Sequence, residues 1–212
     1  MENLRIPGVL QRFSISYLVV STLHLISIVK FANHFLNLHT STYTYHCSDL
    51  LPYWFEWIWI IIMSLTYIVV TLCWKYSDTC PVGYQGPGGL HLESKYFNCT
   101  GGAARALDIL VFGTNHIYKY NSVKKIYHNS LDHDPEGLLG FLTSIVLTFF
   151  GLQAGKIFVI YKSDKHKIIH WLGWAILTRK LTCNQMFDHS FNLQSFIVQF
   201  FCSVTHFCVN TF

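Results

Sequence analysis

A long polar segment between two apolar runs, from Lys75 to Gly137, carries most of the side chains that could do chemistry. It contains His116 and ends with the acidic residues Asp134 and Glu136. A histidine can serve as a general base near neutral pH, and two neighbouring carboxylates can bind a cationic group. A structural interpretation stands beside each: His116 could be a hydrogen-bonded structural residue, and the carboxylates could only cap and charge-balance a helix. The sequence leaves both alternatives open.

The same segment is rich in glycine and holds two cysteines, Cys80 and Cys99. Asn98, Cys99 and Thr100 form an N-glycosylation sequon, which is typical of a lumenal or secreted segment. Cysteines beside a sequon fit an oxidising compartment, so we predict a disulfide between Cys80 and Cys99. The glycines match no phosphate-binding pattern and are expected to permit tight turns. No C-x-x-C or H-E-x-x-H spacing occurs, so we predict no metal site.

The elements that must position these side chains are membrane helices. The chain has 212 residues, of which 51% are hydrophobic and only 12% charged. A bilayer core needs roughly 20 apolar residues of helix, and the sequence supplies that length at about residues 9–29, 54–74 and 138–161. The net charge of +4 is scattered rather than gathered into a basic stripe, which argues against nucleic-acid binding. We predict an all-α membrane protein, a polytopic helix bundle with a long loop over residues 75–137.

Basic residues indicate which way that loop faces. Lys162, Lys165 and Lys167 follow the third apolar run, and short basic loops stay on the cytoplasmic side of a membrane. Because one span separates these lysines from residues 75–137, the loop is expected to be lumenal, in agreement with the sequon. Arg5 and Arg12 then lie on the lumenal side, against the charge rule.

Two further apolar runs are weaker. Residues 168–177 stop at Arg179 and Lys180 and are too few to cross a bilayer. Residues 191–212 are long enough but carry several polar side chains, so they are at most a marginal fourth span.

The third span has the clearest start in the sequence. Asp134 can cap the helix, Pro135 suits its first position, and Glu136 opposes the positive end of the helix dipole. Within the span, Gly151 and Gly155 form a G-x-x-x-G pattern, which lets another helix approach closely. We expect packing inside a bundle, and the same pattern could join two copies of the chain.

An aromatic belt marks the start of the second span, where Trp54, Trp57 and Trp59 occur together. Tryptophan is enriched at membrane interfaces. Glu56 lies within this group, and we expect its carboxylate among the lipid headgroups.

Six sequence blocks, in a shared order and spacing, resemble the heparan-alpha-glucosaminide N-acetyltransferase family over about Leu4 to Leu177. The blocks are Arg5 to Arg12 (RIPGVLQR), Cys80 to Gly89 (CPVGYQGPGG), Asn98 to Ala104 (NCTGGAA), His116 to Tyr118 (HIY), Asp134 to Gly140 (DPEGLLG) and Gly151 to Lys156 (GLQAGK).

The resemblance implies a polytopic lysosomal enzyme. Such an enzyme takes acetyl from cytosolic acetyl-CoA and delivers it across the membrane to the terminal glucosamine amine of heparan sulfate. It also implies a longer parent, because the family has further spans on both sides, including an upstream segment with its catalytic histidine. We therefore do not equate His116 with the acetyl-carrying histidine, and we expect this chain alone to be inactive. Residues 178–212 depart from the family pattern and are interpreted as a divergent tail, either a marginal span or an artefact of the gene model.

The implied reaction assigns tasks to particular residues. Acetyl transfer to an amine needs a base for the ammonium proton, stabilisation of the oxyanion and exclusion of water from the thioester. The polar segment and its flanks offer six titratable residues for these tasks: Asp108, His116, Asp132, His133, Asp134 and Glu136. Asp134 and Glu136 could bind the amine, whereas Arg5, Gln11 and Arg12 could meet the pantetheine arm or carbonyl of acetyl-CoA.

A second class of function fits the same composition. Polar groups within apolar spans, such as Arg12 and Gln153, would also suit a transporter-like or structural membrane protein, or an inactive remnant of the enzyme. The long loop, with a disulfide and Gly-Pro-Gly turns, favours the enzyme. An enzyme that closes over a sugar needs an ordered loop of this kind, whereas a transporter does not.

Overall fold

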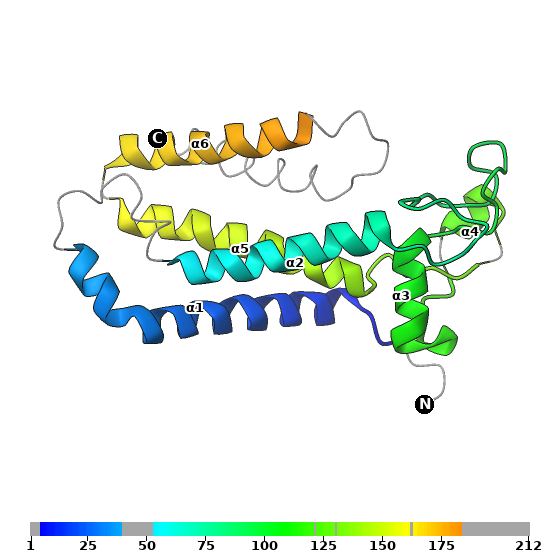
Figure 1. Cartoon of the computed structure of the whole chain (residues 1–212), viewed down its shortest axis with the longest axis horizontal. Coiled ribbons are helices and arrows are strands. Elements are labelled where there is room, and N and C mark those ends of the chain that lie inside the picture. The colour runs from blue at the N-terminus through cyan, green and yellow to red at the C-terminus, as the bar shows by residue number, and fades with distance from the viewer. Residues whose placement is uncertain (1–4, 40–52, 121, 130, 162, 184–212) are drawn as a thin grey trace. The chain divides into compact units, whose positions relative to one another are not determined.

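The computed structural model describes residues 5–39, 53–120, 122–129, 131–161 and 163–183, and every element within these ranges is helical. Figure 1 labels the α-helices, and the helical elements follow here in chain order. They are α1 (Val9–His39), α2 (Trp54–Cys73), α3 (Gly102–Phe112), the 3-10 helix η3 (Thr114–His116), α4 (Ser122–Tyr127), α5 (Leu138–Ile160) and α6 (Asp164–Cys183). The predicted all-α class is confirmed.

Three of the described helices are long and apolar enough to cross a membrane, namely Val9–Lys30 of α1, Trp54–Cys73 and Leu138–Ile160. The prediction of three spans is confirmed. The run after the third span forms a longer helix than expected, because α6 continues through Arg179 and Lys180 to Cys183, although it is not among the membrane-spanning candidates. The marginal fourth span over residues 191–212 lies outside the described residues.

The chain divides into two compact units, and the division passes within α1, α2 and α5. One unit, called the loop unit here, comprises Met1–Ser21 and Ile58–Val146. The other, called the aromatic unit, comprises Thr22–Trp57 and Leu147–Phe212.

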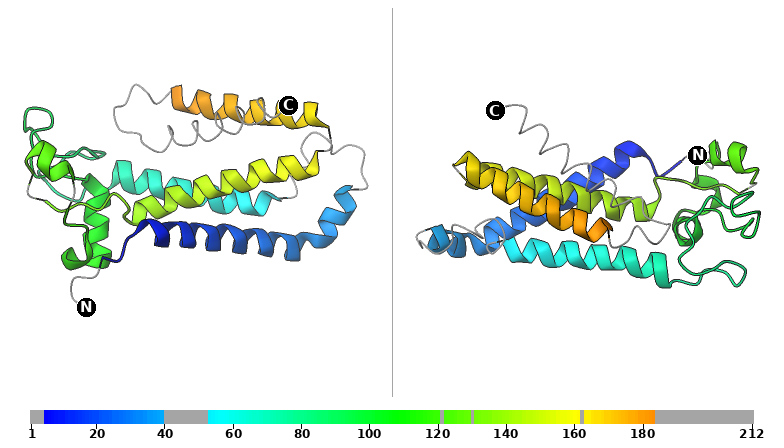
Figure 2. Two further views of the ribbon diagram at one scale, coloured as in Figure 1. Left: turned by 180° about the vertical axis from the view of Figure 1, so that it is seen from behind. Right: turned by 90° about the horizontal axis from the view of Figure 1, so that it is seen from above.

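The loop unit gathers the polar segment beside the C-terminal end of α2 and the N-terminal end of α5 (Figure 2). Its interior is built from Ile117 in this segment and from Leu139, Phe141 and Ile145 on α5, each at most 9% exposed. A disulfide joins Cys80 to Cys99, and both residues are buried. The segment between α2 and α5 is therefore an ordered, crosslinked cap on the ends of these helices.

Glycine is required where α3 begins. Gly102 has a φ of +54°, a left-handed conformation that favours glycine, and a side chain there would overlap the carbonyl oxygen of Tyr84. The close approach brings the turn around Tyr84 against the first turn of α3. The expectation that glycines here serve turns and close packing fits this position.

The start of α5 differs from the sequence expectation. The helix begins at Leu138, four residues after Asp134, so Asp134 is not its cap and Pro135 is not in its first turn. The side chain of Asp108, from α3, instead accepts a hydrogen bond of 2.7 Å from the Leu138 N–H. Asp108, which is far from Leu138 in sequence, therefore caps α5 in place of Asp134, because the fold brings the first turn of α5 against α3.

Stacked rings form the interior of the aromatic unit. Trp57 lies parallel to Trp174 of α6, with ring centroids 5.2 Å apart, and meets the edge of Phe149 at 4.9 Å. A second cluster joins Ile157 and Tyr161 to Trp171. These contacts pack α6 against the C-terminal half of α5 (Figure 2).

Glu56 is buried among protein side chains, whereas the sequence predicted its carboxylate among the lipid headgroups. Its side chain is 1% exposed and contacts His24 and Lys156. A carboxylate can be buried in this way because both of its oxygens have partners.

Close packing of another helix at the G-x-x-x-G pattern of Gly151 and Gly155 stays a prediction. Among the described residues, a Cβ added at Gly155 would have no atom within 4 Å.

Candidate functional site

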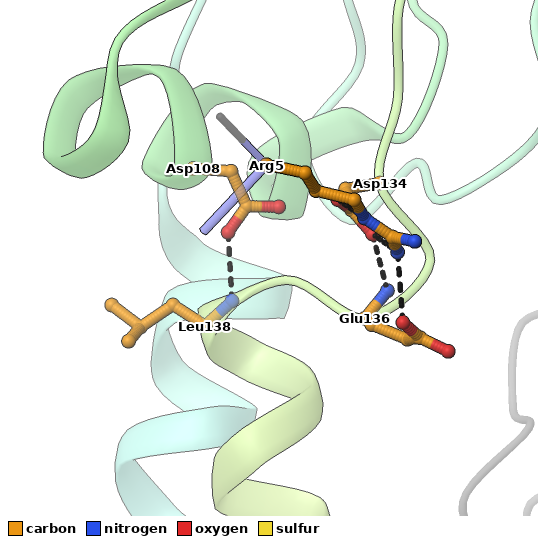
Figure 3. A network of polar contacts seen from close by, with 5 residues as sticks. All are labelled: Arg5, Asp108, Asp134, Glu136 and Leu138. Carbon is orange, nitrogen blue, oxygen red and sulfur yellow. Dashed lines mark hydrogen bonds and ion pairs between the residues drawn. The ribbon is translucent and has the colours of Figure 1, made fainter. Parts of the chain in front are cut away.

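Arg5 is the centre of a polar network in the loop unit (Figure 3). Its Nε donates to Asp134 Oδ2 at 3.0 Å, and its Nη2 donates to Asp134 Oδ1 and to Glu136 Oε2, each at 2.8 Å. Hydrogen bonding to Asp134 raises the pKa of Arg5 above its usual value. The guanidinium also lies 4.5 Å from the centre of the Tyr118 ring, within cation–π range. Arg5, which precedes α1, is thus held by three side chains of the polar segment.

The two carboxylates of this network differ in access. The side chain of Asp134 is 0% exposed, whereas that of Glu136 is 18% exposed. Asp134 Oδ1 also accepts from the Glu136 N–H at 3.0 Å, which fixes the turn between them. The buried Asp134 therefore orients Arg5, and the partly exposed Glu136 is the carboxylate that an incoming group can reach.

Asp108 lies beside this network with one oxygen unused. Oδ1 accepts from Leu138, but Oδ2 is buried without a hydrogen-bond partner among the described residues. Burial raises the pKa of Asp108 from 3.8 to about 6. A side chain at Gly137 would overlap this carboxyl group, so glycine is needed for the approach. Asp108 can hold a proton in a mildly acidic compartment.

A second layer ties the network to α3 and α4. The Nε of Arg105, on α3, donates to the carbonyl oxygen of Asp132 at 2.6 Å, and Lys124 of α4 pairs with the Asp132 carboxylate. Burial lowers the pKa of His133 below its usual value, which favours the neutral ring. These contacts hold the chain immediately before Asp134.

His116 is near the network through its backbone. It lies half-buried in η3, and its carbonyl oxygen accepts a hydrogen bond of 3.4 Å from the Ile6 N–H, next to Arg5. This bond helps to place both Arg5 and Tyr118. The predicted role of His116 as a base stays a prediction.

Gln11 and Arg12 lie on the first turns of α1 and are not in the Arg5 network. Gln11 is exposed, and its side chain folds back towards Gly8. Arg12 is half-buried and lies close to Gly140 of α5. The grouping of Arg5, Gln11 and Arg12 as contacts to acetyl-CoA stays a prediction.

Asn98, the predicted glycosylation site, is exposed next to the buried Cys99. Its side chain points into solvent-accessible space, as a glycan requires.

The charges of the network suit a cationic ligand. One arginine faces two carboxylates, and Asp108 adds a third ionisable oxygen pair nearby. Within the described ranges no group of three or more His, Cys, Asp or Glu side chains could hold a metal ion. An amine that reaches Glu136 would find a hydrogen-bond acceptor, an excess of negative charge and a neighbouring carboxyl group able to exchange protons.

Sequence reasoning did not single out Asp108 or Tyr118 as members of this site. Asp108 was one of six titratable candidates, and its signal was an acidic residue among the apolar residues of a short helix, Ile109 and Leu110 following it. Tyr118 carried no signal besides its place in the HIY block.

Comparison with known proteins confirms the resemblance inferred from the sequence blocks. Heparan-alpha-glucosaminide N-acetyltransferase from Homo sapiens is 37% identical over 177 residues, which are 83% of this chain and 26% of that protein. The protein of the same name from Mus musculus is 36% identical over 194 residues, which are 88% of this chain and 29% of that protein. The chain thus spans between a quarter and a third of the length of these curated relatives. No protein-family model matches it.

Proposed function

Because most of the chain is similar to part of heparan-alpha-glucosaminide N-acetyltransferase, we propose that it forms part of a membrane-embedded N-acetyltransferase. The reaction moves acetyl from acetyl-CoA to the terminal glucosamine amine of heparan sulfate. The enzyme resides in the lysosomal membrane, with residues 75–137 in the lumen. The loop unit supplies the part of the site that receives the amine.

The Arg5 network is the observation that supports this assignment. Glu136 uses Oε2 for Arg5, and Figure 3 shows its other oxygen pointing away from the guanidinium. That oxygen can accept a hydrogen bond from the glucosamine ammonium group. Arg5 keeps Glu136 in place, and the buried Asp134 keeps Arg5 in place.

Proton transfer must accompany the reaction. The ammonium group loses a proton before its nitrogen can attack the acetyl carbonyl carbon. The new C–N bond forms as the bond between the acetyl group and its carrier breaks, and the carrier atom, which is the sulfur of CoA in direct transfer or the nitrogen of the upstream histidine in an acetyl-enzyme, keeps the electron pair and takes up a proton. Glu136 is positioned to accept the proton of the amine. Asp108, with its pKa of about 6, can exchange protons nearby at the pH of an acidic lumen. Arg5 is 36% exposed and can stabilise negative charge on the acetyl oxygen.

Gln11 and Arg12 remain proposed contacts to acetyl-CoA, separate from the amine site. His116 remains a proposed base; its carbonyl oxygen accepts a hydrogen bond from the N–H of Ile6, the residue after Arg5.

Amine binding by the whole chain in lipid nanodiscs tests the proposal. A heparan-sulfate oligosaccharide that ends in glucosamine should bind, and its N-acetylated counterpart should bind more weakly because it has no charge at the amine. Glu136→Gln removes one charge-assisted hydrogen bond, which is worth about 1.5–3 kcal/mol, so the Kd should rise by about 10- to 100-fold.

Glu93→Gln is the matched control, because Glu93 is an exposed carboxylate of the same polar segment. It should leave the Kd unchanged. Equal binding of the free and acetylated sugars, or equal effects of the two substitutions, would contradict an amine site at Glu136.

A further inference from the structure

A second cluster of ionisable side chains lies in the aromatic unit, within the membrane-spanning candidates. It joins His24 of α1, Glu56 of α2 and Lys156 of α5. Ionisable groups inside spans are costly and often mark a functional site. The proposed acetyl transfer at Glu136 does not use this cluster.

Both oxygens of Glu56 are occupied. Oε1 lies 2.8 Å from Nδ1 of His24, and Oε2 accepts from Nζ of Lys156. The Lys156 ammonium also lies 3.5 Å from the centre of the Tyr53 ring, a cation–π contact that suits a charged lysine. An ion pair of Glu56 with Lys156 leaves the carboxylate without a proton to donate. The hydrogen between Glu56 and His24 therefore belongs to Nδ1 of the histidine.

This assignment also determines whether the other ring nitrogen of His24, Nε2, carries a hydrogen. With Glu56 and Lys156 balancing each other, a neutral ring keeps the cluster uncharged, as a low-dielectric interior favours. A neutral ring with hydrogen on Nδ1 has its lone pair on Nε2. The contacts of His24 within the described part of the chain are those to Glu56 and to the Tyr53 ring, so Nε2 has no hydrogen-bond partner there. The side chain is 26% exposed.

Ser27 supplies an independent observation. It is 0% exposed, and its hydroxyl has no hydrogen-bond partner among the described residues. Residues three apart lie on the same side of a helix, so Ser27 is the neighbour of His24 on α1. A buried hydroxyl without a partner is costly in an apolar interior, and it can serve as a second contact for a polar ligand.

A structural role explains only part of this arrangement. Glu56 and Lys156 alone would neutralise each other and join α2 to α5. The histidine adds a ring that a carboxylate orients through Nδ1, the arrangement that leaves Nε2 available as a base in many catalytic sites.

We propose that Nε2 of His24 is an open hydrogen-bond acceptor for a small neutral ligand group bearing an O–H or S–H hydrogen, with Ser27 as the second contact. The ligand donates this hydrogen to the lone pair of Nε2, the O–H or S–H bond stays intact, and the ring stays neutral.

Nitrogen-15 NMR of the chain, labelled at histidine and held in nanodiscs, tests the tautomer. The His24 signals, assigned by their loss in His24→Gln, should show a protonated Nδ1 and an unprotonated Nε2. In Glu56→Gln the amide can donate or accept, so the preference for hydrogen on Nδ1 should be lost. A wild-type ring with hydrogen on Nε2 would overturn the proposal whether or not Glu56→Gln folds.

Small alcohols and thiols test the ligand class. 1-Propanol or 1-propanethiol, added to the same sample, should shift the Nε2 signal of His24, and Ser27→Ala should reduce the shift. His170 is the internal control, because it stacks on Tyr161 at 4.2 Å in the same unit. No shift with either compound, or an equal shift at His170, would contradict the ligand site.

Diethyl pyrocarbonate gives a chemical readout of the same lone pair. Peptide mass spectrometry should find His24 modified in wild type, with several-fold slower modification in Glu56→Gln and no change at His170. Protection of wild-type His24 from the reagent would contradict an open Nε2.

Discussion

Arg5 lies between a fully buried carboxylate and a partly exposed one, and its three hydrogen bonds to them are 2.8–3.0 Å long. The planar guanidinium can bond both oxygens of Asp134 at once, which a lysine cannot do. Loss of the guanidinium would leave Asp134 buried without its partner. At the scale of single residues, we therefore expect the loop unit to depend on this pair.

Arg5→Ala should therefore lower the free energy of unfolding of the loop unit by about 2–4 kcal/mol, since it strands a buried carboxylate. Arg5→Lys should recover only part of the loss. Chemical unfolding in detergent micelles, followed by tyrosine fluorescence, measures the effect. Lys75→Ala is the control, because its pair with Asp78 is exposed and should contribute little. Equal losses for the two alanine variants would argue against the Arg5 network.

Asp108 has a distinct pH signature. Its pKa in the folded chain, about 6, lies above its ordinary value of 3.8. Between these values the folded chain holds a proton that the unfolded chain has lost, so this group makes stability fall as the pH rises through that window.

Asp108→Asn should remove that part of the pH dependence, because Asn can still accept from the Leu138 N–H but does not titrate. Relative to the variant, wild type should lose about 1–2 kcal/mol of unfolding free energy between pH 4 and pH 6. Melting curves of both proteins across this range measure it. Parallel pH profiles would contradict the raised pKa.

At the scale of elements, the polar segment is held by a crosslink and by contacts between chain segments far apart in sequence. Cys80 and Cys99 are 19 residues apart and buried. Within the same segment the Gly101 N–H donates to the Gly86 carbonyl at 3.0 Å. Short helices such as α4 have little stability of their own, so these contacts keep the segment ordered.

Cys80→Ser should destabilise the loop unit by about 3 kcal/mol, because a closed loop of this length restricts the unfolded chain. Limited proteolysis should then cut residues 75–137 faster than in wild type. Cys73→Ser is the matched control, since Cys73 is an exposed free cysteine at the end of α2. Cleavage at the wild-type rate in Cys80→Ser would show that the other contacts suffice.

At the scale of the whole molecule, three of the described helices are long and apolar enough to cross a membrane. Residues 75–137 lie between the second and third of these helices. The proposed lumenal side of this segment is what makes an acceptor site for a sugar amine feasible there.

Asn98→Gln should abolish an endoglycosidase-sensitive mass shift of the chain expressed in cells, because the sequence holds one N-x-S/T sequon. Thr100→Ser is the control, since it keeps the sequon and should keep the shift. A wild-type chain without the shift, whose segment is labelled by a membrane-impermeant reagent added from the cytoplasmic side, would place the segment in the cytosol.

The sequence by itself determined the three spans, the all-helical class and the family resemblance, and it predicted the pairing of Cys80 with Cys99. These features depend on composition, length and short blocks of residues, all of which are local properties of the chain.

Only the tertiary structure decided which charges meet. Arg5 and Asp134 are 129 residues apart, Asp108 rather than Asp134 caps α5, and Glu56 is buried between His24 and Lys156. No spacing in the sequence encodes these pairs, because a charge inside a low-dielectric fold is stabilised by whichever distant partner the packing of the helices brings within hydrogen-bond distance.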